Sequence, residues 1–277
     1  MRWLAAWLLL APGVALGQGL PGGLPEGLQG SWVQGDCASP VALLQVTARA
    51  VARVPVAGHG RLLRFTGLRD VAGWSLGTAG GAAAPRLLLR PAGEALETAE
   101  PEAKTRDDLL PGPAPVIRWQ RCATVPATLA AQHGEGFALL AALEHLEAAC
   151  TGDAATCLGA LVAQVDVSGD GQLGSAELAR LVRGLGWVVA LQGGASVEAL
   201  GATTGAAGLG GVLAARLLVE SLDYDGNGRL SSAELGQDRL ALGAARGTGT
   251  GRPFDGALAE QGLDALRGLL PGLGLLR

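Results

Sequence analysis

The chain has 277 residues, a net charge of −4 and 49% hydrophobic residues. This length suggests one or two domains, and the hydrophobic content is ample for a core. Aromatic residues make up only 4%, so that core must consist mainly of Leu, Ala and Val. The mild acidity gives no sign of the clustered basic surface that nucleic-acid binding needs, and no nucleic-acid partner is expected.

Residues 1–17 are predicted to be a secretory signal peptide. Met1-Arg2 gives a short positive start, the apolar run Trp3 to Val14 is too short for a stable membrane span, and Ala15-Leu16-Gly17 places small residues at a cleavage site. The alternative is a buried N-terminal helix. The sequence therefore predicts an exported protein, periplasmic or extracellular. No uncharged apolar span of 18 residues follows, so no transmembrane segment is expected after the signal peptide.

All four cysteines lie after this segment, as expected for an oxidising compartment. Four cysteines allow three pairings. We expect Cys37–Cys122, which would tie the two ends of the N-terminal region together, and Cys150–Cys157, which would join two successive helices.

Residues 18–126 are predicted to form a β domain after a Pro- and Gly-rich leader at 18–29. Short apolar or alternating runs are separated by Gly, Pro and Asp at roughly regular spacing, which indicates a sandwich or a barrel. The expected strands are Val41–Val46, Ala50–Val56, Arg61–Thr66, Trp74–Gly77, Arg86–Arg90 and Val116–Cys122.

Gly30-Ser31-Trp32 resembles the Gly-x-Trp start of lipocalin-type barrels and of the small barrels of bacterial periplasmic protease inhibitors. The resemblance covers few residues, and the segment is shorter than a full lipocalin, so we expect no roomy ligand cavity. Trp32 is expected to be a core residue. The string Gly73-Trp74-Ser75-Leu76-Gly77 fits the G-x-S-x-G nucleophile pattern. It lies among short strands with no helical pattern after it, so no catalytic role is expected and the protein is predicted not to be an enzyme.

Residues 127–277 are predicted to be helical. Between two of the predicted helices lies a Gly/Ala-rich stretch, Gly193–Gly208, that is longer than a simple connection. We expect it to form a short extra helix, a lid or a membrane-touching segment. Asp153 is expected to cap the second helix. The expected helices are Phe137–Cys150, Ala154–Val165, Ser175–Leu191, Leu209–Leu222, Ala233–Leu242 and an amphipathic Phe254–Leu270.

Two twelve-residue loops share one pattern, D-V-S-G-D-G-Q-L-G-S-A-E at 166–177 and D-Y-D-G-N-G-R-L-S-S-A-E at 223–234. Both place oxygen donors at positions one, three and five, Gly at six, Leu at eight and Glu at twelve. A hard cation such as Ca²⁺ takes about six to eight oxygen ligands, and alternate side chains on a tightly curled loop can supply them.

The two loops closely resemble those of the EF-hand family, here in an exported, bacterial-type protein. The resemblance implies Ca²⁺ as the cofactor, a helix on either side of each loop, and a short bridge pairing Leu173 with Leu230. It also implies that Gln172 and Arg229 bind through their backbone carbonyls. The implied ligands are Asp166, Ser168, Asp170, Gln172 and Glu177 in the first loop, and Asp223, Asp225, Asn227, Arg229 and Glu234 in the second.

The predicted fold class is therefore α+β, with a small disulfide-tied antiparallel β barrel or sandwich followed by an all-α, paired EF-hand domain. The expected function is calcium binding by an exported, non-enzymatic protein in which Ca²⁺ acts as a structural clamp. The alternatives are a ligand- or protein-binding, inhibitor-like barrel that the calcium domain stabilises, and a calcium sensor. Calcium ions are the expected partners, together with an unidentified protein.

Overall fold

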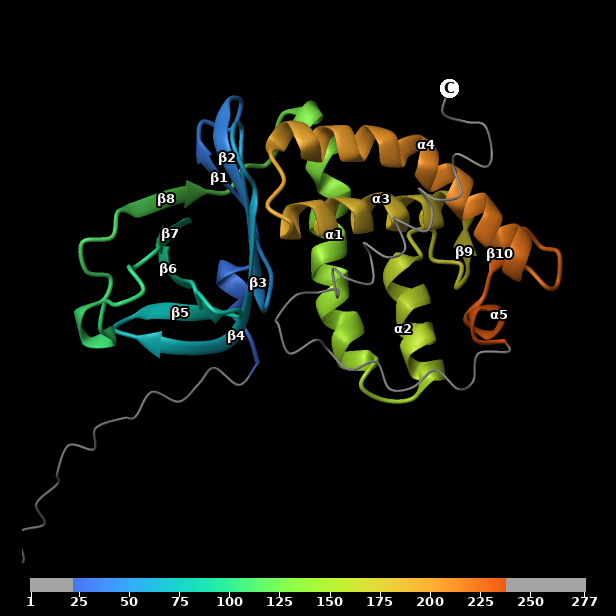
Figure 1. Ribbon diagram of the computed structural model, residues 1–277, viewed down its shortest axis with the longest axis horizontal. Helices are drawn as coiled ribbons and strands as arrows, with labels where there is room; N and C mark the ends of the chain where they lie inside the picture. Colours follow the sequence, from blue (N-terminus) through green and yellow to red (C-terminus); the bar gives the residue numbers. More distant parts are fainter. Residues whose placement is uncertain (1–21, 238–277) are drawn as a thin grey trace, which may run out of the picture.

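The computed structural model describes residues 22–237, apart from the side chains of 206 and 207. Two parts lie side by side in Figure 1, a β barrel and a group of helices. The predicted signal peptide and the predicted helix Phe254–Leu270 lie outside the described residues.

The first part is a closed antiparallel barrel in which each strand pairs with the next and β1 pairs with β8. This settles the choice that the sequence left open between a sandwich and a barrel. Two of its strands, β1 and β7, were not among the predicted ranges. The strands are β1 Gly30–Gly35, β2 Pro40–Val46, β3 Ala50–Pro55, β4 Arg61–Val71, β5 Trp74–Ala79, β6 Arg86–Ala92, β7 Ala95–Ala99 and β8 Val116–Gln120.

Alternating side chains on the strands build the core of the barrel. Leu44 and Val51 point inward, whereas their neighbours Leu43 and Ala52 belong to a second cluster outside the barrel. The strands β2 and β3 therefore read as nearly continuous apolar runs because both of their faces are covered.

One end of the barrel is closed by a short 3-10 helix, η1 (Glu26–Leu28). Trp32 is buried as predicted, and its indole N–H donates to the carbonyl of Leu28 at 2.9 Å. The guanidinium of Arg121 lies 4.1 Å from the centre of the Trp32 ring and donates to the carbonyls of Gly27 and Gln29. This arrangement fixes the start of β1 to the chain that leaves β8.

Both predicted disulfides are present. Cys37–Cys122 joins the loop after β1 to the residues after β8, at the seam where the strand pairing is limited to Val33 and Gln120. Cys150–Cys157 joins the end of the first helix to the first turn of the second. The two bonds are compatible with an exported or otherwise oxidising environment.

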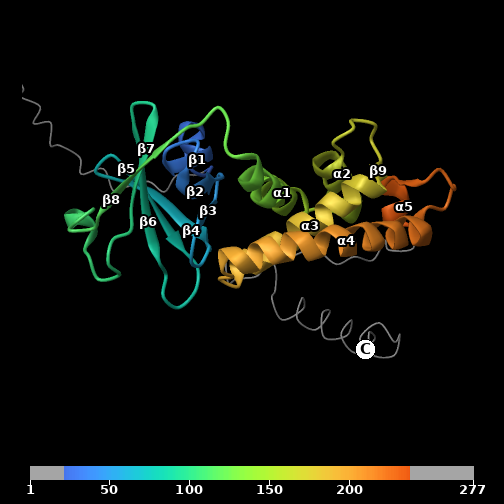
Figure 2. The same ribbon diagram turned by 90° about the horizontal axis from the view of Figure 1, so that it is seen from above.

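The second part is helical, and its order along the chain is helix, helix, loop, helix, helix, loop, short helix (Figures 1 and 2). The barrel itself contains a second 3-10 helix, η2 (Asp107–Leu109), in the loop between β7 and β8. The elements are α1 Ala127–Ala149, α2 Ala154–Val165, β9 Leu173–Gly174, α3 Ser175–Gln192, α4 Val197–Leu222, β10 Arg229–Leu230 and α5 Ser232–Gly236.

The Gly/Ala-rich surplus is neither a lid nor a separate short helix, because α4 begins at Val197 and takes in most of it. Glycines lower helix propensity, and one glycine of α4 allows close packing against α3. A Cβ on Gly211 would lie 3.1 Å from the carbonyl oxygen of Ala179 on α3. At the other end of the helical part, α5 ends at Gly236 and Gln237 is extended; the rest of the predicted helix Ala233–Leu242 lies outside the described residues.

Among residues 22–237, no single helix is long and apolar enough to cross a membrane. Two portions of α4, Val197–Gly205 and Gly208–Leu222, meet the length and composition criteria only when taken together across a bend of 44°.

The barrel and the helices share one hydrophobic cluster. Val33, Leu43 and Val54 on the outer face of β1–β3 pack with Trp187 and Leu191 of α3. Polar contacts join the same surfaces. Figure 2 shows α4 starting beside the barrel and extending away from it along the helical part.

Two acidic residues of α1 contribute to this interface. The Glu144 carboxylate accepts hydrogen bonds from the Thr47 hydroxyl and the Arg49 backbone N–H, and Glu147 forms an ion pair with Arg64. Both glutamates therefore hold α1 against the barrel.

Candidate metal centre

The two acidic loops lie at the end of the helical part that is remote from the barrel (Figure 1). The first connects α2 to α3, and the second connects α4 to α5. All ten predicted ligand residues lie in these two loops. The N-cap predicted for α2 is also present, because the Asp153 carboxylate accepts the Thr156 backbone N–H at 2.9 Å.

In the first loop, the Asp166 carboxylate turns inward and accepts the backbone N–H groups of Gly169 at 2.6 Å and Gly171 at 2.7 Å. From the far end of the loop, Glu177 accepts the N–H of Ser168 at 2.9 Å through Oε1. The Ser168 hydroxyl donates to Asp166 at 3.1 Å. Asp166, Ser168 and Glu177 are therefore drawn together around the loop.

In the second loop, Asp223 accepts the N–H groups of Asn227 at 3.0 Å and Gly228 at 2.7 Å. Glu234 returns from α5 and accepts the N–H of Tyr224 at 3.1 Å. Carboxylate oxygens of Asp223, Asp225 and Glu234 all lie within 4.8 Å of one another, and Glu234 is buried.

Glycines give both loops their curvature. Gly169 and Gly171 have φ of +76° and +79°, and Gly226 and Gly228 have +73° and +81°. A side chain is strained in this left-handed region, whereas glycine adopts it freely. Gly171 and Gly228 occupy position six, where the turn directs their N–H groups at the first aspartate of each loop.

The predicted bridge between the loops is present. Leu173 pairs with Leu230, and Gly174 pairs with Arg229, in a two-stranded antiparallel sheet. Both leucines are fully buried in a cluster that includes Val162 of α2 and Leu178 of α3. The two loops are thus held side by side by a hydrophobic core and not only by their polar groups.

Hydrogen bonds favour the ionised form of three of these carboxyl groups. The Gly171 N–H holds the pKa of Asp166 below its usual value, against a smaller opposing effect of burial. Burial raises the pKa of Glu177, but hydrogen bonds from Gly174, Ser168 and Val167 outweigh it, and the pKa is lowered overall.

The pKa of Glu234 is lowered for the same kind of reason, chiefly by hydrogen bonds from the backbone and hydroxyl of Ser231. The two glutamates also cap helices. Glu177 accepts the Gly174 N–H at 2.8 Å at the start of α3, and Glu234 accepts the Ser231 N–H at 2.8 Å at the start of α5. Both oxygens of each glutamate accept backbone N–H groups, so a glutamine in either place would lose the charge and keep only one acceptor oxygen.

The donor set fits a hard divalent cation. The candidate donors in both loops are oxygens, the carboxylates of the second loop lie within 4.8 Å of one another, and the four cysteines are committed to disulfides. An oxygen-only set of this kind suits Ca²⁺ or Mg²⁺ and not a soft transition metal. A terminal glutamate that can offer two oxygens favours the larger ion, Ca²⁺.

Sequence reasoning missed the role of one side chain in this centre. It assigned Arg229 only a backbone carbonyl, but the Arg229 guanidinium forms an ion pair with Asp170 of the other loop. The sequence did contain a signal for this ion pair. It places a cationic residue at position seven of one loop, opposite a glycine on the partner strand of the bridge.

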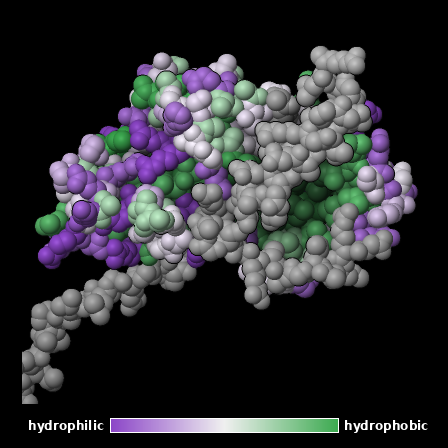
Figure 3. All heavy atoms as spheres, viewed as in Figure 1, coloured by the Kyte–Doolittle hydropathy of each residue, from purple (hydrophilic) through white to green (hydrophobic). Residues whose placement is uncertain are grey.

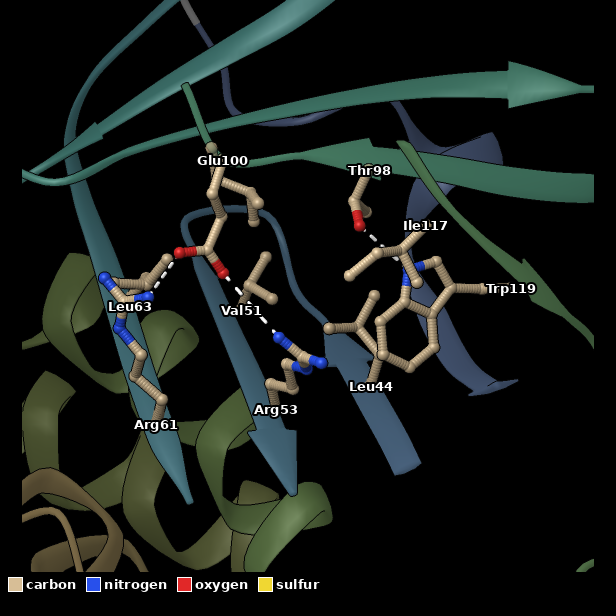
Figure 4. A pocket seen from close by; sticks show the side chains of 10 residues that line it. Leu44, Val51, Arg53, Arg61, Leu63, Thr98, Glu100, Ile117 and Trp119 are labelled. Atoms are coloured by element: carbon tan, nitrogen blue, oxygen red, sulfur yellow. Dashed lines mark hydrogen bonds and ion pairs between the residues drawn. The ribbon is translucent and has the colours of Figure 1, made fainter. Parts of the chain in front are cut away.

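A polar cluster on the barrel is shown in Figure 4. Glu100 forms ion pairs with Arg61 and, at 3.9 Å, with Arg53, and the Arg53 guanidinium lies 5.8 Å from the centre of the Trp119 ring. The cavity beneath this cluster measures about 20 Å³ and has room for about one water molecule. This space is too small for a lipocalin-type ligand.

Comparisons of the chain with protein-family models, with curated proteins and with solved structures found no match.

Proposed function

We propose that this protein is an exported, non-enzymatic calcium-binding protein with a pair of EF-hand loops, each of which holds one Ca²⁺. The convergence of Asp223, Asp225 and Glu234 carries the proposal. Three negative charges so close together repel one another, and a bound divalent cation would remove that repulsion.

The proposed role of the ion is a structural clamp. Asp166 stands at the end of α2 and Glu177 in the first turn of α3, so one ion bound to both would fix the angle between the two helices. The second loop relates α4 and α5 in the same way. An ion that binds only the folded state stabilises it by mass action, in proportion to RT ln(1 + [Ca²⁺]/Kd).

The absence of an enzymatic role is part of this proposal. Ser75 of the G-x-S-x-G string lies within β5, is buried, and donates to Asp70 on the neighbouring strand at 3.3 Å. A nucleophile elbow requires a sharp turn from a strand into a helix, with the serine exposed. The β-hairpin around Ser75 supplies neither feature.

Calorimetric titration of the purified chain with Ca²⁺ tests the proposal. We expect two bound ions in the wild type, one in Glu177→Gln, one in Glu234→Gln and none in the double variant. Glu220→Gln is the matched control, because it removes an exposed carboxylate from α4 next to the second loop without touching the predicted ligands. Unchanged calcium binding in the double variant would eliminate the proposed sites.

A second candidate function, a calcium sensor with a protein partner, is favoured by the surface of α4. Leu209, Leu213 and Leu217 share one face of the helix and are 85%, 62% and 54% exposed. Figure 3 also shows hydrophobic residues gathered in a hollow on the helical part. Apolar-dye binding during the calcium titration separates the two functions, because a clamp loses dye binding when calcium is added and a sensor gains it.

A further inference from the structure

The two loops differ at position seven, where the first carries Gln172 and the second Arg229. Arg229 pairs with Gly174 in the two-stranded bridge. Because Gly174 has no side chain, the Arg229 side chain can cross the bridge into the first loop. There its guanidinium forms an ion pair with the carboxylate of Asp170, at position five of that loop.

This ion pair occupies a predicted calcium ligand. Asp170 accepts the Gln172 backbone N–H at 3.0 Å through Oδ1, and Arg229 contacts its other oxygen, Oδ2. Both carboxylate oxygens are therefore engaged. The second loop differs at this position, because its residue five is the neutral Asn227, whose oxygen accepts only from within its own loop, from the Arg229 N–H at 2.8 Å.

The acidic side chains of the two loops are also arranged differently. Within residues 22–237, the carboxylates of the second loop form a group close enough to hold one metal ion, whereas Asp166, Asp170 and Glu177 of the first loop form no such group. Two features account for the difference. Position three of the first loop is Ser168 rather than an aspartate, and Asp170 is paired with Arg229.

We propose that the Arg229 guanidinium is a tethered cation that competes with Ca²⁺ for the Asp170 carboxylate, and so makes the first loop the weaker of the two calcium sites. This inference rests on the function proposed above. Filling the first loop requires Arg229 to release Asp170, whereas the second loop has no such requirement. A residue of one loop thereby sets the calcium affinity of the other.

The expected size of the effect follows from the exposure of the pair. The side chains of Arg229 and Asp170 are 45% and 36% exposed, and exposed ion pairs are weak and screened by salt. Removing the competition should therefore tighten the first loop by about two- to fivefold at low ionic strength. The gain should shrink as salt is added, because the ion pair is itself weakened.

The experiment measures calcium binding to the first loop alone, in the Glu234→Gln background. Adding Arg229→Gln keeps the backbone carbonyl and gives position seven the residue that Gln172 supplies in the first loop. Arg229→Lys keeps the positive charge. Arg216→Gln, on the exposed surface of α4, controls for the loss of a positive charge elsewhere in the helical part.

We expect Arg229→Gln to lower the dissociation constant of the first loop, and Arg229→Lys and Arg216→Gln to leave it within about 1.5-fold of the background value. In the Glu177→Gln background, where only the second loop binds, Arg229→Gln should change the affinity by a smaller factor. Asp223→Asn replaces Glu234→Gln as the background if that variant loses its helical circular dichroism.

The possible outcomes separate this inference from the proposed function. If the wild-type chain binds no calcium, the proposed function itself is wrong. If calcium binds but Arg229→Gln leaves the first loop unchanged, the function stands and the competition is refuted. Equal tightening by Arg229→Gln and Arg216→Gln would also refute it, because the effect would then come from overall charge.

Discussion

Gly136 of α1 provides a sharp test of the packing that joins the acidic loops to the barrel. A Cβ built on Gly136 would lie well inside van der Waals contact with the ring of Trp187 on α3, and the contact atoms are in the ring and not at the end of a flexible chain. Trp187 is only 1% exposed, so the ring has little room to move. Its N–H also donates to His133 at 3.0 Å, and Phe137 packs against its edge.

We expect Gly136→Ala to destabilise the protein by about 1–2 kcal/mol. Overpacking a core costs about 1–3 kcal/mol, and replacing a helical glycine with alanine returns about 0.5–1 kcal/mol. Gly134→Ala is the matched control, two residues away on the same helix, where an added Cβ meets nothing within 4 Å. That variant should be more stable than the wild type by about 0.5–1 kcal/mol.

The assay is urea denaturation at a fixed calcium concentration, followed by tryptophan fluorescence and far-UV circular dichroism. The two variants make the same chemical change in one helix, so their difference of about 1.5–3 kcal/mol isolates the contact with Trp187. If Gly136→Ala is as stable as Gly134→Ala, α1 and α3 do not pack as described.

The remaining predictions concern a buried histidine and the disulfides. Burial lowers the pKa of His133 below its ordinary value of about 6.5, so the unfolded chain binds a proton that the folded chain does not. Stability should therefore fall as the pH drops below about 6.5, by up to about 1.4 kcal/mol per pH unit, and His133→Asn should flatten this slope in denaturation curves measured between pH 5 and 7. Removing Cys37–Cys122, with a sequence separation of 85, should cost about 4.6 kcal/mol, and removing Cys150–Cys157, with a separation of 7, about 2.5 kcal/mol. Thermal denaturation of the two Cys→Ser double variants should rank them in that order, and the reverse order would contradict the loop-entropy argument.

The sequence was most informative where one short segment contains all the interacting groups. The acidic loops could be predicted because each is one twelve-residue segment, in which Glu177 returns to accept the Val167 N–H, and the Asp153 cap because its partner lies three residues away. The bridge between Leu173 and Leu230 joins residues far apart in the chain, and it could be predicted only because the resemblance to a known loop family implies it.

The sequence was least informative where the partner lies far along the chain. Glu144 reads as a solvent-facing helical residue, yet its partners, Thr47 and Arg49, are more than 90 residues away on the barrel. Closure of the barrel through Val33 and Gln120 is equally invisible to local alternation. The periodicity of a helix shows which residues share a face, but it does not show what that face meets.

The side chain of Arg229 is an intermediate case. The loop pattern assigns only a backbone carbonyl to position seven and accepts any side chain there. The pattern alone therefore does not predict the contacts of an arginine side chain at this position. The register of the bridge, which sets Arg229 opposite Gly174, accounts for these contacts. Structure adds most to a recognised motif at the positions that the motif leaves free.

The position of α3 links the two halves of the molecule. The helix begins in the first loop, where Glu177 lies in its first turn, and over its 18 residues, about 27 Å, it reaches the outer face of the barrel. There Val188 and Leu191 pack with Leu43 and Val54 in one core. A clamp at one end of a rigid helix restrains the other end, because α3 cannot tilt without opening that core. Calcium bound to the first loop, as proposed, would therefore stabilise the interface with the barrel as well as the loop, which is a physical reason for joining a barrel to the two acidic loops.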